Sequence, residues 1–598
     1  MLLNFGSFIE KFTEKIHSAK TISIANIAKL VLETGKIKYG SSVDEVAKFF
    51  YDKYIGTSGK EAMAQQLQTL LNDILYDEDR DWNVTYTYSG AVKVTPTVDD
   101  KQLPSDITVM QGKSETEYRL SWLTKYSVTG TDIEIVEENA EFTGTPTTTG
   151  VEAASEETTY GGYGYDFGNF GILPWTRDGV RHYITVSELK ENTTYKYRIG
   201  DASKGFWSEE CTLKTGGDSN GSFIFMTDIA GTTKADYSSW ADTLSAARAK
   251  AKNAEMLLLG GDSVTISGND DQWNMALNSA RDTLTSLSVA YAAGDRDICE
   301  AGAMRYFNAA FETEDTDENK TGGYYSFDRD DIHFIVLNTN DKNSDGTLSS
   351  AQCSWLNLDL KLNSTAQWTV ILMHASCYDA NGNVTNLGKQ LNEYATKYGV
   401  DLVLSSGSGT YARTKLINNG TAAANAETTT VKANSKTYTA LVDPNGTVYI
   451  NGGNGGSTAG NENVTKTDIF ESVSGGKNMF TLIRTSDGTL TIDTYEVIDG
   501  KTTVVDSYAI YNNRLKALRG DVDQDGKVSV KDARLALRAV VRLDSPSAFE
   551  RVLIDVDDSH SIDVYDARSI LRVAIKLDNY DSNKYIVCTK NQLSKLDF

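Results

Sequence analysis

The spacing of apolar and polar residues changes character twice along the chain, near residue 79 and again near residue 217. Up to Tyr76 the apolar residues recur at helical intervals, which predicts a few amphipathic helices in a first segment, residues 1–78. From about Trp82, short stretches rich in Thr, Tyr and Val are separated by Gly and Asp, and this pattern predicts a β-sandwich over residues 79–216. The first segment contains no residue pattern that indicates a chemical function.

After Gly217 apolar strands and amphipathic helices alternate, which predicts a layered α/β domain over residues 217–513. The predicted strands are residues 222–228, 255–262, 288–295, 332–340, 368–374 and 401–405, and the predicted helices include 238–254, 271–287 and 387–399. Residues 436–457 are expected to form the closing strands of this domain. Such domains bind ligands where their strands end, and each of these strands ends in polar or glycine-rich residues.

Net charge narrows the choice of partners. The 598 residues include 82 acidic and 58 basic side chains, a formal charge of -24. This charge repels phosphate backbones and anionic lipids, so we expect neither nucleic acid nor a membrane surface as a partner. The hydrophobic content of 40% is ordinary for soluble domains, and the length predicts several of them in one multidomain α+β chain.

The cysteines and the first residues of the chain indicate neither a metal site nor a location for the protein. The five cysteines are scattered and include no C-x-x-C pair, so they predict neither a disulfide framework nor a structural zinc site. No apolar run approaches the length of a membrane span, and the first residues lack the basic and apolar segments of a secretion signal. We therefore expect that, if the protein is secreted, its signal has been removed or is missing.

A repeat near the C-terminus contains two acidic loops, DVDQDGKVSVKDARLALR from Asp521 and DVDDSHSIDVYDARSILR from Asp555. Calcium requires six to eight oxygen ligands, which a loop of this kind supplies from positions 1, 3, 5, 7, 9 and 12 around a glycine turn. In the first loop these positions are Asp521, Asp523, Asp525, Lys527, Ser529 and Asp532, with Gly526 at the turn. In the second they are Asp555, Asp557, Ser559, Ser561, Asp563 and Asp566. Because Ser559 replaces a carboxylate and His560 replaces the glycine, we predict weaker calcium binding there.

Each loop runs directly into a helix without the incoming helix of an EF-hand, and this arrangement resembles the dockerin modules of cellulosomes. The resemblance covers about residues 520–577 and defines a module at residues 514–580, followed by a tail at residues 581–598. It implies docking onto a cohesin of a scaffold protein, and hence a secreted, scaffold-associated protein within a polysaccharide-degrading complex. The contact residues that it implies are Val530, Lys531, Leu537, Arg538, Val564, Tyr565, Leu571 and Arg572. A calcium-stabilised structural unit without a partner is the alternative.

The strand ends of the α/β domain read TDIAG, GGDSV, AAGDRD, LMHAS and SSGSG. Their order and spacing resemble the purple acid phosphatases, which are calcineurin-like metallophosphoesterases. The resemblance covers roughly residues 103–511, because the predicted sandwich is similar to the fibronectin type III-like N-terminal domain of that family. It implies two adjacent metal ions that activate water and hold phosphate, bound by the motifs D-x-G, G-D-x-x-Y, G-N-H-[DE], V-x-x-H and G-H-x-H.

Only part of this ligand set is present. The residues that match ligands are Asp228, Asp262 and His374. Asp295 replaces a ligand asparagine and supplies an oxygen, Arg296 replaces the histidine that assists catalysis, and Thr265 replaces a tyrosine. The last motif consists of Ser406, Gly407, Ser408 and Gly409, so glycine stands at both histidine positions. Arginine stays protonated and cannot donate a proton as a histidine would.

These observations favour a non-catalytic or severely impaired phosphoesterase-like domain that serves as a binding or structural part of a scaffolded complex. The alternative is an active phosphatase or phosphodiesterase with one Mn, Zn or Mg ion at Asp262, Asp295 and His374, with Asp228 nearby. Carbohydrate binding is a third and weaker hypothesis, suggested by the 31 tyrosines, among them those of the Tyr- and Gly-rich insert at residues 158–175, and by the usual company of dockerins.

Overall fold

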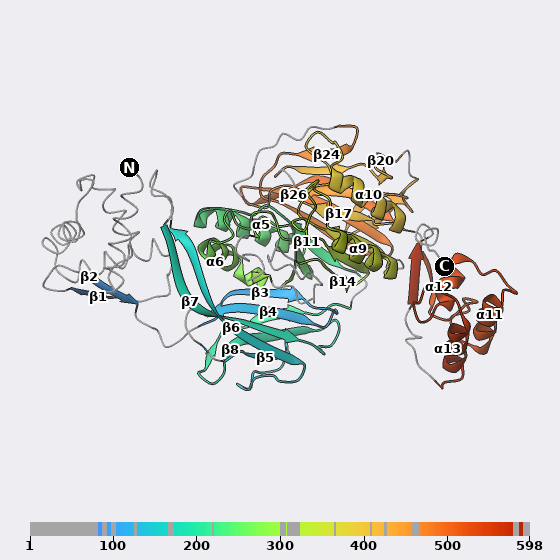
Figure 1. Ribbon diagram of the computed structural model, residues 1–598, viewed down its shortest axis with the longest axis horizontal. Coiled ribbons are helices and arrows are strands. Elements are labelled where there is room, and N and C mark those ends of the chain that lie inside the picture. The colour runs from blue at the N-terminus through green and yellow to red at the C-terminus, as the bar shows by residue number, and fades with distance from the viewer. Residues whose placement is uncertain are drawn as a thin grey trace.

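A computed structural model gives the arrangement of the domains (Figure 1). It describes residues 103–577 except 125–127, 129, 165–172, 218–219, 299–305, 308–322, 364–365, 407–408, 424–426, 457–466 and 513, and also residues 82–86, 92–96 and 585–589. The predicted helices of residues 1–78 lie outside the described residues. Among the helices that are described, none is long and apolar enough to cross a membrane.

Two sheets form the predicted β-sandwich. One has the order β10-β8-β5 with β9 paired to β8, and contains β5 (Asp132–Glu137), β8 (Thr194–Asp201), β9 (Phe206–Trp207) and β10 (Cys211–Lys214). The other has the order β3-β4-β7-β6, and contains β3 (Ser105–Gln111), β4 (Tyr118–Thr124), β6 (Val151–Gly164) and β7 (Leu173–Val186). Fully buried side chains from both sheets, among them Trp122 and Tyr197, form the core between them.

The sandwich departs from the prediction in two respects. β3 pairs in parallel with strand β13 of the next domain at Met110 and Val289, so one sheet continues from the sandwich into the α/β domain. This pairing satisfies an edge of β3 that would otherwise be open. In addition, β1 (Trp82–Tyr86) and β2 (Val92–Pro96), which were expected within the sandwich, pair with each other and with no other described strand.

The α/β domain consists of two facing sheets. The first contains the parallel strands β11 (Ser222–Met226), β12 (Met256–Leu259) and β13 (Ser288–Tyr291), extended beyond β11 by β25 (Met479–Ser486), β26 (Thr489–Ile498), β27 (Lys501–Tyr511), β22 (Lys436–Val442) and β21 (Thr428–Ala433). The second has the order β14 (Tyr325–Arg329), β15 (Ile332–Val336), β16 (Trp368–Leu372), β17 (Leu402–Ser405), β23 (Val448–Gly452), β18 (Tyr411–Thr414) and β24 (Phe470–Ser474). β19 (Ile417–Asn418) and β20 (Thr421–Ala422) form a small separate ribbon.

All six strands predicted for this domain are present, as β11, β12, β13, β15, β16 and β17. The predicted closing strands differ, because β22 and β23 belong to different sheets and β24 to β27 complete the domain after them. Because β23 and β24 are separated by a long interval in the sequence, the local pattern did not indicate that β24 belongs to the same domain.

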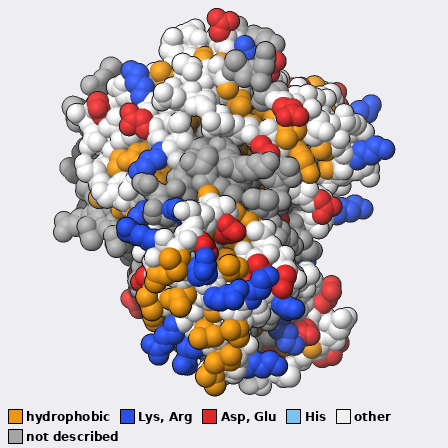
Figure 2. Space-filling view, turned by 90° about the vertical axis from the view of Figure 1, so that its right-hand side faces the viewer, with side chains coloured by type: hydrophobic (Ala, Val, Ile, Leu, Met, Phe, Trp, Pro, Cys, Tyr) orange, Lys and Arg blue, Asp and Glu red, His pale blue; other side chains and the backbone are white. Residues whose placement is uncertain are grey.

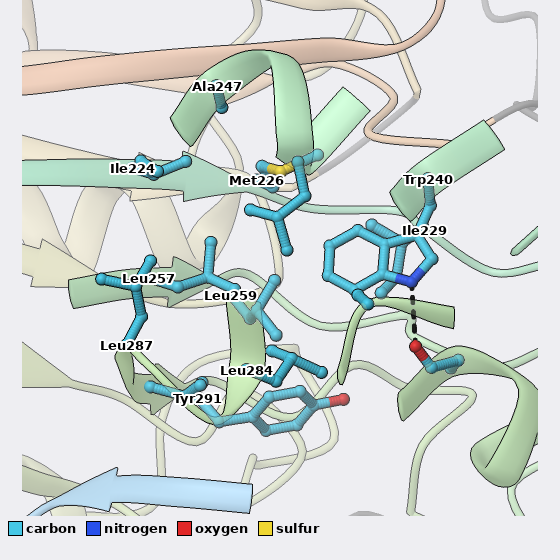
Figure 3. Packing of buried hydrophobic residues seen from close by; sticks show 14 of the residues in the cluster. Ile224, Met226, Ile229, Trp240, Ala247, Leu257, Leu259, Leu284, Leu287 and Tyr291 are labelled. Atoms are coloured by element: carbon cyan, nitrogen blue, oxygen red, sulfur yellow. Dashed lines mark hydrogen bonds between the residues drawn. The ribbon is translucent and has the colours of Figure 1, made fainter. Parts of the chain in front are cut away.

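Alternating side chains explain why these strands read as continuous apolar runs. Phe223 and Phe225 point between the two sheets, whereas Ile224 and Met226 point to the helices on the outer face. Both faces of each central strand are therefore buried, as is usual for parallel sheets between layers. Figure 3 shows the outer layer, in which the indole of Trp240 packs over these residues and donates a hydrogen bond of 3.0 Å to the carbonyl oxygen of Ala276.

Helices cover both outer faces of the paired sheets. α5 (Lys234–Lys250), α6 (Asp270–Ser279) and α7 (Arg281–Leu284) cover the first sheet, and α9 (Ser350–Leu362) and α10 (Asn386–Tyr398) cover the second. The single helix predicted over residues 271–287 is interrupted at Ala280, which ends α6 and precedes α7. A capping box of Thr233 and Asp236 starts α5 four residues before the predicted start.

The C-terminal unit lies at one end of the molecule (Figure 1). It contains β28 (Arg514–Leu518), α11 (Val530–Val540), α12 (Ala548–Ile554), α13 (Val564–Ala574) and β29 (Tyr585–Thr589). β28 and β29 pair in an antiparallel register, so residues 585–589, expected in the tail, close the unit. Ile586 of β29 packs with Ala517, Phe549 and Leu553 in a small apolar core.

Candidate functional site

The ends of four strands bring together the predicted residues of the α/β domain. Asp228 follows β11, Asp262 follows β12, Asp295 follows β13 and His374 follows β16. One ligand atom from each of Asp262, Asp295 and His374 lies within 4.8 Å of the others. Asp228 and Asp262 both have a positive φ, 52° and 53°, an uncommon conformation that turns the chain sharply at each strand end.

His374 is oriented toward these carboxylates. Its Nδ1 lies 2.8 Å from the carbonyl oxygen of Gly260, which can only accept, so Nδ1 carries the proton. Nε2 lies 3.5 Å from Oδ1 of Asp262 and 4.0 Å from Oδ1 of Asp295. A histidine held by a backbone carbonyl in this way presents its other nitrogen to a metal.

Asp262 lies at the centre of the group. Burial raises the pKa of its carboxyl to about 7, while the cation of His374 opposes this shift. Arg296 contacts it through its backbone N–H, 3.2 Å from Oδ1, and through Nε, 3.4 Å from Oδ2. Burial lowers the pKa of His374, but the carboxylates of Asp262 and Asp228 outweigh burial and raise it overall. Imidazole and carboxylates thus stabilise each other's charges when no metal is bound.

Asp228 has a different partner. The hydroxyl of Ser406, which is 1% exposed, donates a hydrogen bond of 2.5 Å to Oδ2 of Asp228. Burial raises the pKa of Asp228, and this hydrogen bond and the cation of His374 act against the shift. The backbone of Gly409 has a φ of 65°, which glycine adopts readily and a side-chain-bearing residue does not. Residues 407 and 408 lie outside the described residues.

Among the described residues of this domain, one group of side chains could hold a metal ion. Asp262, Asp295 and the free Nε2 of His374 form a mixed oxygen and imidazole set that suits Mn, Zn or Mg. Asp228, which matches a ligand of the family pattern, accepts the Ser406 hydroxyl, and Gly407 and Gly409 stand at the two histidine positions of that pattern. Thr265, at the tyrosine position, donates through Oγ1 to the carbonyl oxygen of Gly231 at 3.1 Å.

Asp297 was missed as a functional residue. It is fully buried, and its carboxylate accepts from the backbone N–H of Asp262, Ser263 and Gly294 and from the hydroxyl of Tyr291, at 2.7 to 2.9 Å. It therefore holds the turns after β12 and β13 together and positions Asp262. The acidic last position of G-N-H-[DE] was the available signal, because Asp297 occupies it.

In the C-terminal unit, Asp521, Asp523 and Asp525 converge within 4.8 Å in the first loop. Oδ2 of Asp521 accepts from the N–H of Gly526 at 2.8 Å, and Gly526 has a φ of 90°. Asp532, buried at the start of α11, accepts from the N–H and hydroxyl of Ser529 at 2.8 Å. The exposed Lys527 follows the turn, with its N–H donating to Asp525.

The second loop has the same plan and also four aspartates at the ligand positions, but serine replaces the aspartate at its fifth position and aspartate replaces the serine at its ninth. Asp555, Asp557 and Asp566 converge within 4.8 Å. Burial raises the pKa of Asp566 to about 6. Ser559 donates its N–H to Asp555 at 2.9 Å, and His560 adopts a φ of 60° at the position of Gly526. Ser561 is exposed, and Asp563 caps α13 by accepting from the N–H of Tyr565.

The residues predicted to contact a partner lie on α11 and α13. Five of the eight are large apolar side chains that are 39 to 60% exposed: Val530, Leu537, Val564, Tyr565 and Leu571. Lys531 pairs with Asp523, and Arg538 pairs with Asp544 at 2.6 Å. Arg572 is half-buried. The side chains of residues 159–175, nearly the whole of the Tyr- and Gly-rich insert, lie outside the described residues, so the carbohydrate hypothesis stays a prediction.

The described α/β domain has two facing mixed sheets, helices on both outer faces and polar strand ends that meet at one edge. Comparison with known proteins identifies the type. Residues 104–215 match the family profile of the purple acid phosphatase N-terminal domain. The structure of purple acid phosphatase PPD1 from yellow lupin (Lupinus luteus) seeds superimposes with a TM-score of 0.55 over 70% of this chain and 77% of that chain, at 17% identity. The α/β domain and sandwich thus have a purple acid phosphatase-like fold.

Proteins with similar sequences are also purple acid phosphatases. The chain is 24% identical over 297 residues to purple acid phosphatase 22 of Arabidopsis thaliana, which covers 48% of this chain and 60% of the relative. It is 27% identical over 302 residues to purple acid phosphatase 1 of Ipomoea batatas, which covers 47% and 59%. The chain therefore spans about 60% of the length of these relatives.

Proposed function

We propose that this chain is a secreted component of a cellulosome-type complex, docked onto a scaffold cohesin through its calcium-dependent C-terminal unit, with a phosphoesterase-like domain that does not perform two-metal hydrolysis. The hydrogen bond from Ser406 to Asp228 carries the catalytic part of this proposal. The bond occupies an oxygen of Asp228, a residue that matches a metal ligand of the family pattern. Ser406 itself precedes Gly407 and Gly409, which stand where that pattern has two ligand histidines. Secretion belongs to the proposal, because cohesins are extracellular partners.

The requirements of two-metal catalysis support the proposal that this domain has little or no phosphoester hydrolase activity. Two-metal phosphoesterases use one ion to lower the pKa of the attacking water and both ions to stabilise the transferred phosphate. With one metal position and a guanidinium at Arg296, the domain can still bind an anion. Arg296 remains charged, however, and cannot protonate a leaving group. The domain is therefore suited to binding or structural support.

Calcium would control the docking surface. Two carboxylate charges 4.8 Å apart repel each other by about 3 kcal/mol at an effective dielectric constant of 20. Each loop holds several such pairs, and a bound cation removes this repulsion. The residues at the ninth position of the loops, Ser529 and Asp563, are the N-caps of α11 and α13, so the last loop positions lie in the first turn of each helix. Ordering of the loops by calcium therefore also orders the helices that expose the apolar contact residues.

Docking is tested by surface plasmon resonance of the full chain against a panel of purified cohesins, with calcium and with a chelator. We expect at least one cohesin to bind in calcium and to dissociate on chelation. The double variant Leu537→Asp, Leu571→Asp should lose binding. Leu358→Asp is the matched control, because Leu358 of α9 is 55% exposed but lies outside the C-terminal unit. Failure of every cohesin, or binding that ignores calcium, would contradict docking.

A single-metal hydrolase is the second candidate, favoured by the convergence of Asp262, Asp295 and His374. It is tested with aryl phosphate mono- and diesters in the presence of added Mn, Zn or Mg. We expect no metal-dependent turnover above the rate of a chain with Asp262→Ala. Turnover that needs metal and is abolished both by Asp262→Ala and by His374→Ala would replace the non-catalytic proposal.

A further inference from the structure

The apolar surface of α11 and α13 is larger than the predicted contact set. Val541 and Leu543 lie at the end of α11 and just after it, 54% and 67% exposed, and Ile575 and Leu577 occupy the same places at α13, 48% and 65% exposed. The pairs are 34 residues apart, as are Val530 and Val564, and Leu537 and Leu571. Both copies of the repeat therefore expose equivalent aliphatic side chains, whereas monomeric proteins rarely expose large contiguous apolar surface.

Cations surround these apolar residues. Residues 529–543 and 563–577 contain seven basic side chains, Lys531, Arg534, Arg538, Arg542, Arg568, Arg572 and Lys576. The only acidic residues in the two stretches are Asp532, Asp563 and Asp566, all of them predicted calcium ligands, and Asp532 and Asp566 are buried. Arg534 and Arg568 are exposed and form no ion pair with a carboxylate among the described residues. Figure 2 shows apolar side chains beside Lys and Arg on the lower part of this end of the molecule.

The sign of this surface is opposite to that of the whole chain, whose formal charge is -24. Screening at physiological salt limits charge effects to about 8 Å, so a partner at this surface meets the local cations rather than the distant acidic residues. An apolar centre with a charged rim is the usual composition of a specific protein interface. Arg534 and Arg568, exposed cations of this rim without an ion pair among the described residues, favour a partner with acidic groups facing them.

We infer that the partner of the C-terminal unit is a protein whose docking face is apolar at its centre and acidic at its rim, and that this rim accelerates association. This inference rests on the proposed docking function and specifies its partner. The exposed apolar residues are almost all Val, Leu and Ile on helices of 11 residues, with Tyr565 as the one aromatic among those described. Interfacial membrane helices instead carry Trp and Phe among their apolar anchors, so a protein partner is favoured over an anionic bilayer.

The test uses the full chain with calcium, immobilised cohesins, and vesicles of phosphatidylcholine with phosphatidylserine as the competing class of ligand. The variant is Arg534→Glu with Arg568→Glu, one exposed cation from each repeat. The control is Lys389→Glu with Lys397→Glu, which changes the total charge equally on the exposed face of α10. Circular dichroism in calcium verifies that both variants are folded.

We expect the association rate to fall about tenfold in the Arg534 and Arg568 variant, and the unmodified chain to associate about tenfold more slowly in high salt. The control should match the unmodified chain. Calcium-dependent binding that is insensitive to salt and to charge reversal would overturn the acidic partner while docking stands. No binding by any cohesin would overturn docking and this inference together. If the chain binds the vesicles but no cohesin, and the Arg534 and Arg568 variant loses this binding, the surface is a membrane-binding surface instead.

Discussion

Deleting part of the Ile586 side chain should raise the calcium concentration at which the C-terminal unit becomes ordered. Ile586 is 6% exposed and packs in β29 against Phe549 and Leu553 of α12 and Ala517 of β28. An Ile→Ala change at a buried site lowers the free energy of unfolding by about 2 to 5 kcal/mol. We take about 3 kcal/mol for Ile586→Ala, because the small core formed by β28, β29 and α12 can partly collapse.

A calcium titration measures this loss of folding free energy as a shift in the calcium concentration at which half of the unit is folded. If two ions bind the folded unit, each tenfold rise in free calcium above the dissociation constants stabilises it by about 2.7 kcal/mol. A loss of about 3 kcal/mol therefore requires about tenfold more calcium to restore the same folded population. Hydrogen exchange of peptides from residues 514–589, measured in the full chain across a calcium titration, reports this midpoint directly.

Ile575→Ala is the matched control, because it removes the same atoms from a side chain that is 48% exposed. Its calcium midpoint should stay within about twofold of that of the unmodified chain. Equal midpoints for Ile586→Ala and the unmodified chain would refute the role of β29 in closing the unit. Equal shifts for both variants would refute the assignment of the effect to burial.

Three further predictions concern buried groups of the α/β domain. Burial lowers the pKa of His333, but two hydrogen-bonded aspartates outweigh burial and raise the pKa to about 9, so the stabilisation from this histidine is complete below about pH 6.5 and is lost as the pH rises through 9. The free energy of unfolding in urea should fall by about 3 kcal/mol between pH 6.5 and 9.5, and His333→Gln should flatten this slope, whereas an unchanged slope would contradict the prediction. Arg329→Met removes the fully buried partner of Glu255 and should cost about 3 kcal/mol in urea unfolding, and a loss below about 1 kcal/mol would show that the pair is not needed. Asp297→Ala leaves three backbone donors beside Asp262 unpaired and should lower stability by about 4 kcal/mol, with Asp297→Asn less damaging, so equal stability of the unmodified chain and Asp297→Ala would contradict its positioning role.

Local patterns predicted the strands and strand-end residues of the α/β domain because each strand is buried on both faces and ends in a polar turn. Asp228, Asp262 and His374 could be found in this way. The Ser406 hydroxyl could not be placed on Asp228, since the two residues are 178 positions apart and serine in a glycine-rich stretch has many possible partners. The sequence shows serine and glycine at these positions but not which contacts Ser406 makes.

Long-range pairing accounts for the other differences. The parallel contact of β3 with β13 joins two predicted domains through a single register pair, which no local periodicity encodes. Tyr585–Thr589 is apolar and rich in β-branched residues, which is typical of a strand, but its partner β28 lies on the other side of both acidic loops. Sequence patterns predict elements better than they predict which distant element each one pairs with.

We propose that the phosphoesterase-like domain lacks a two-metal centre, and the metal content of the purified full chain is the measurement that tests this proposal. The chain is incubated with Mn, Fe and Zn, passed over a desalting column in the presence of a calcium-selective chelator, and analysed by inductively coupled plasma mass spectrometry. The donor set of Asp262, Asp295 and His374 predicts at most one retained transition metal per chain, lost in Asp262→Ala. Two tightly retained transition metals per chain would contradict the proposed lack of a two-metal centre.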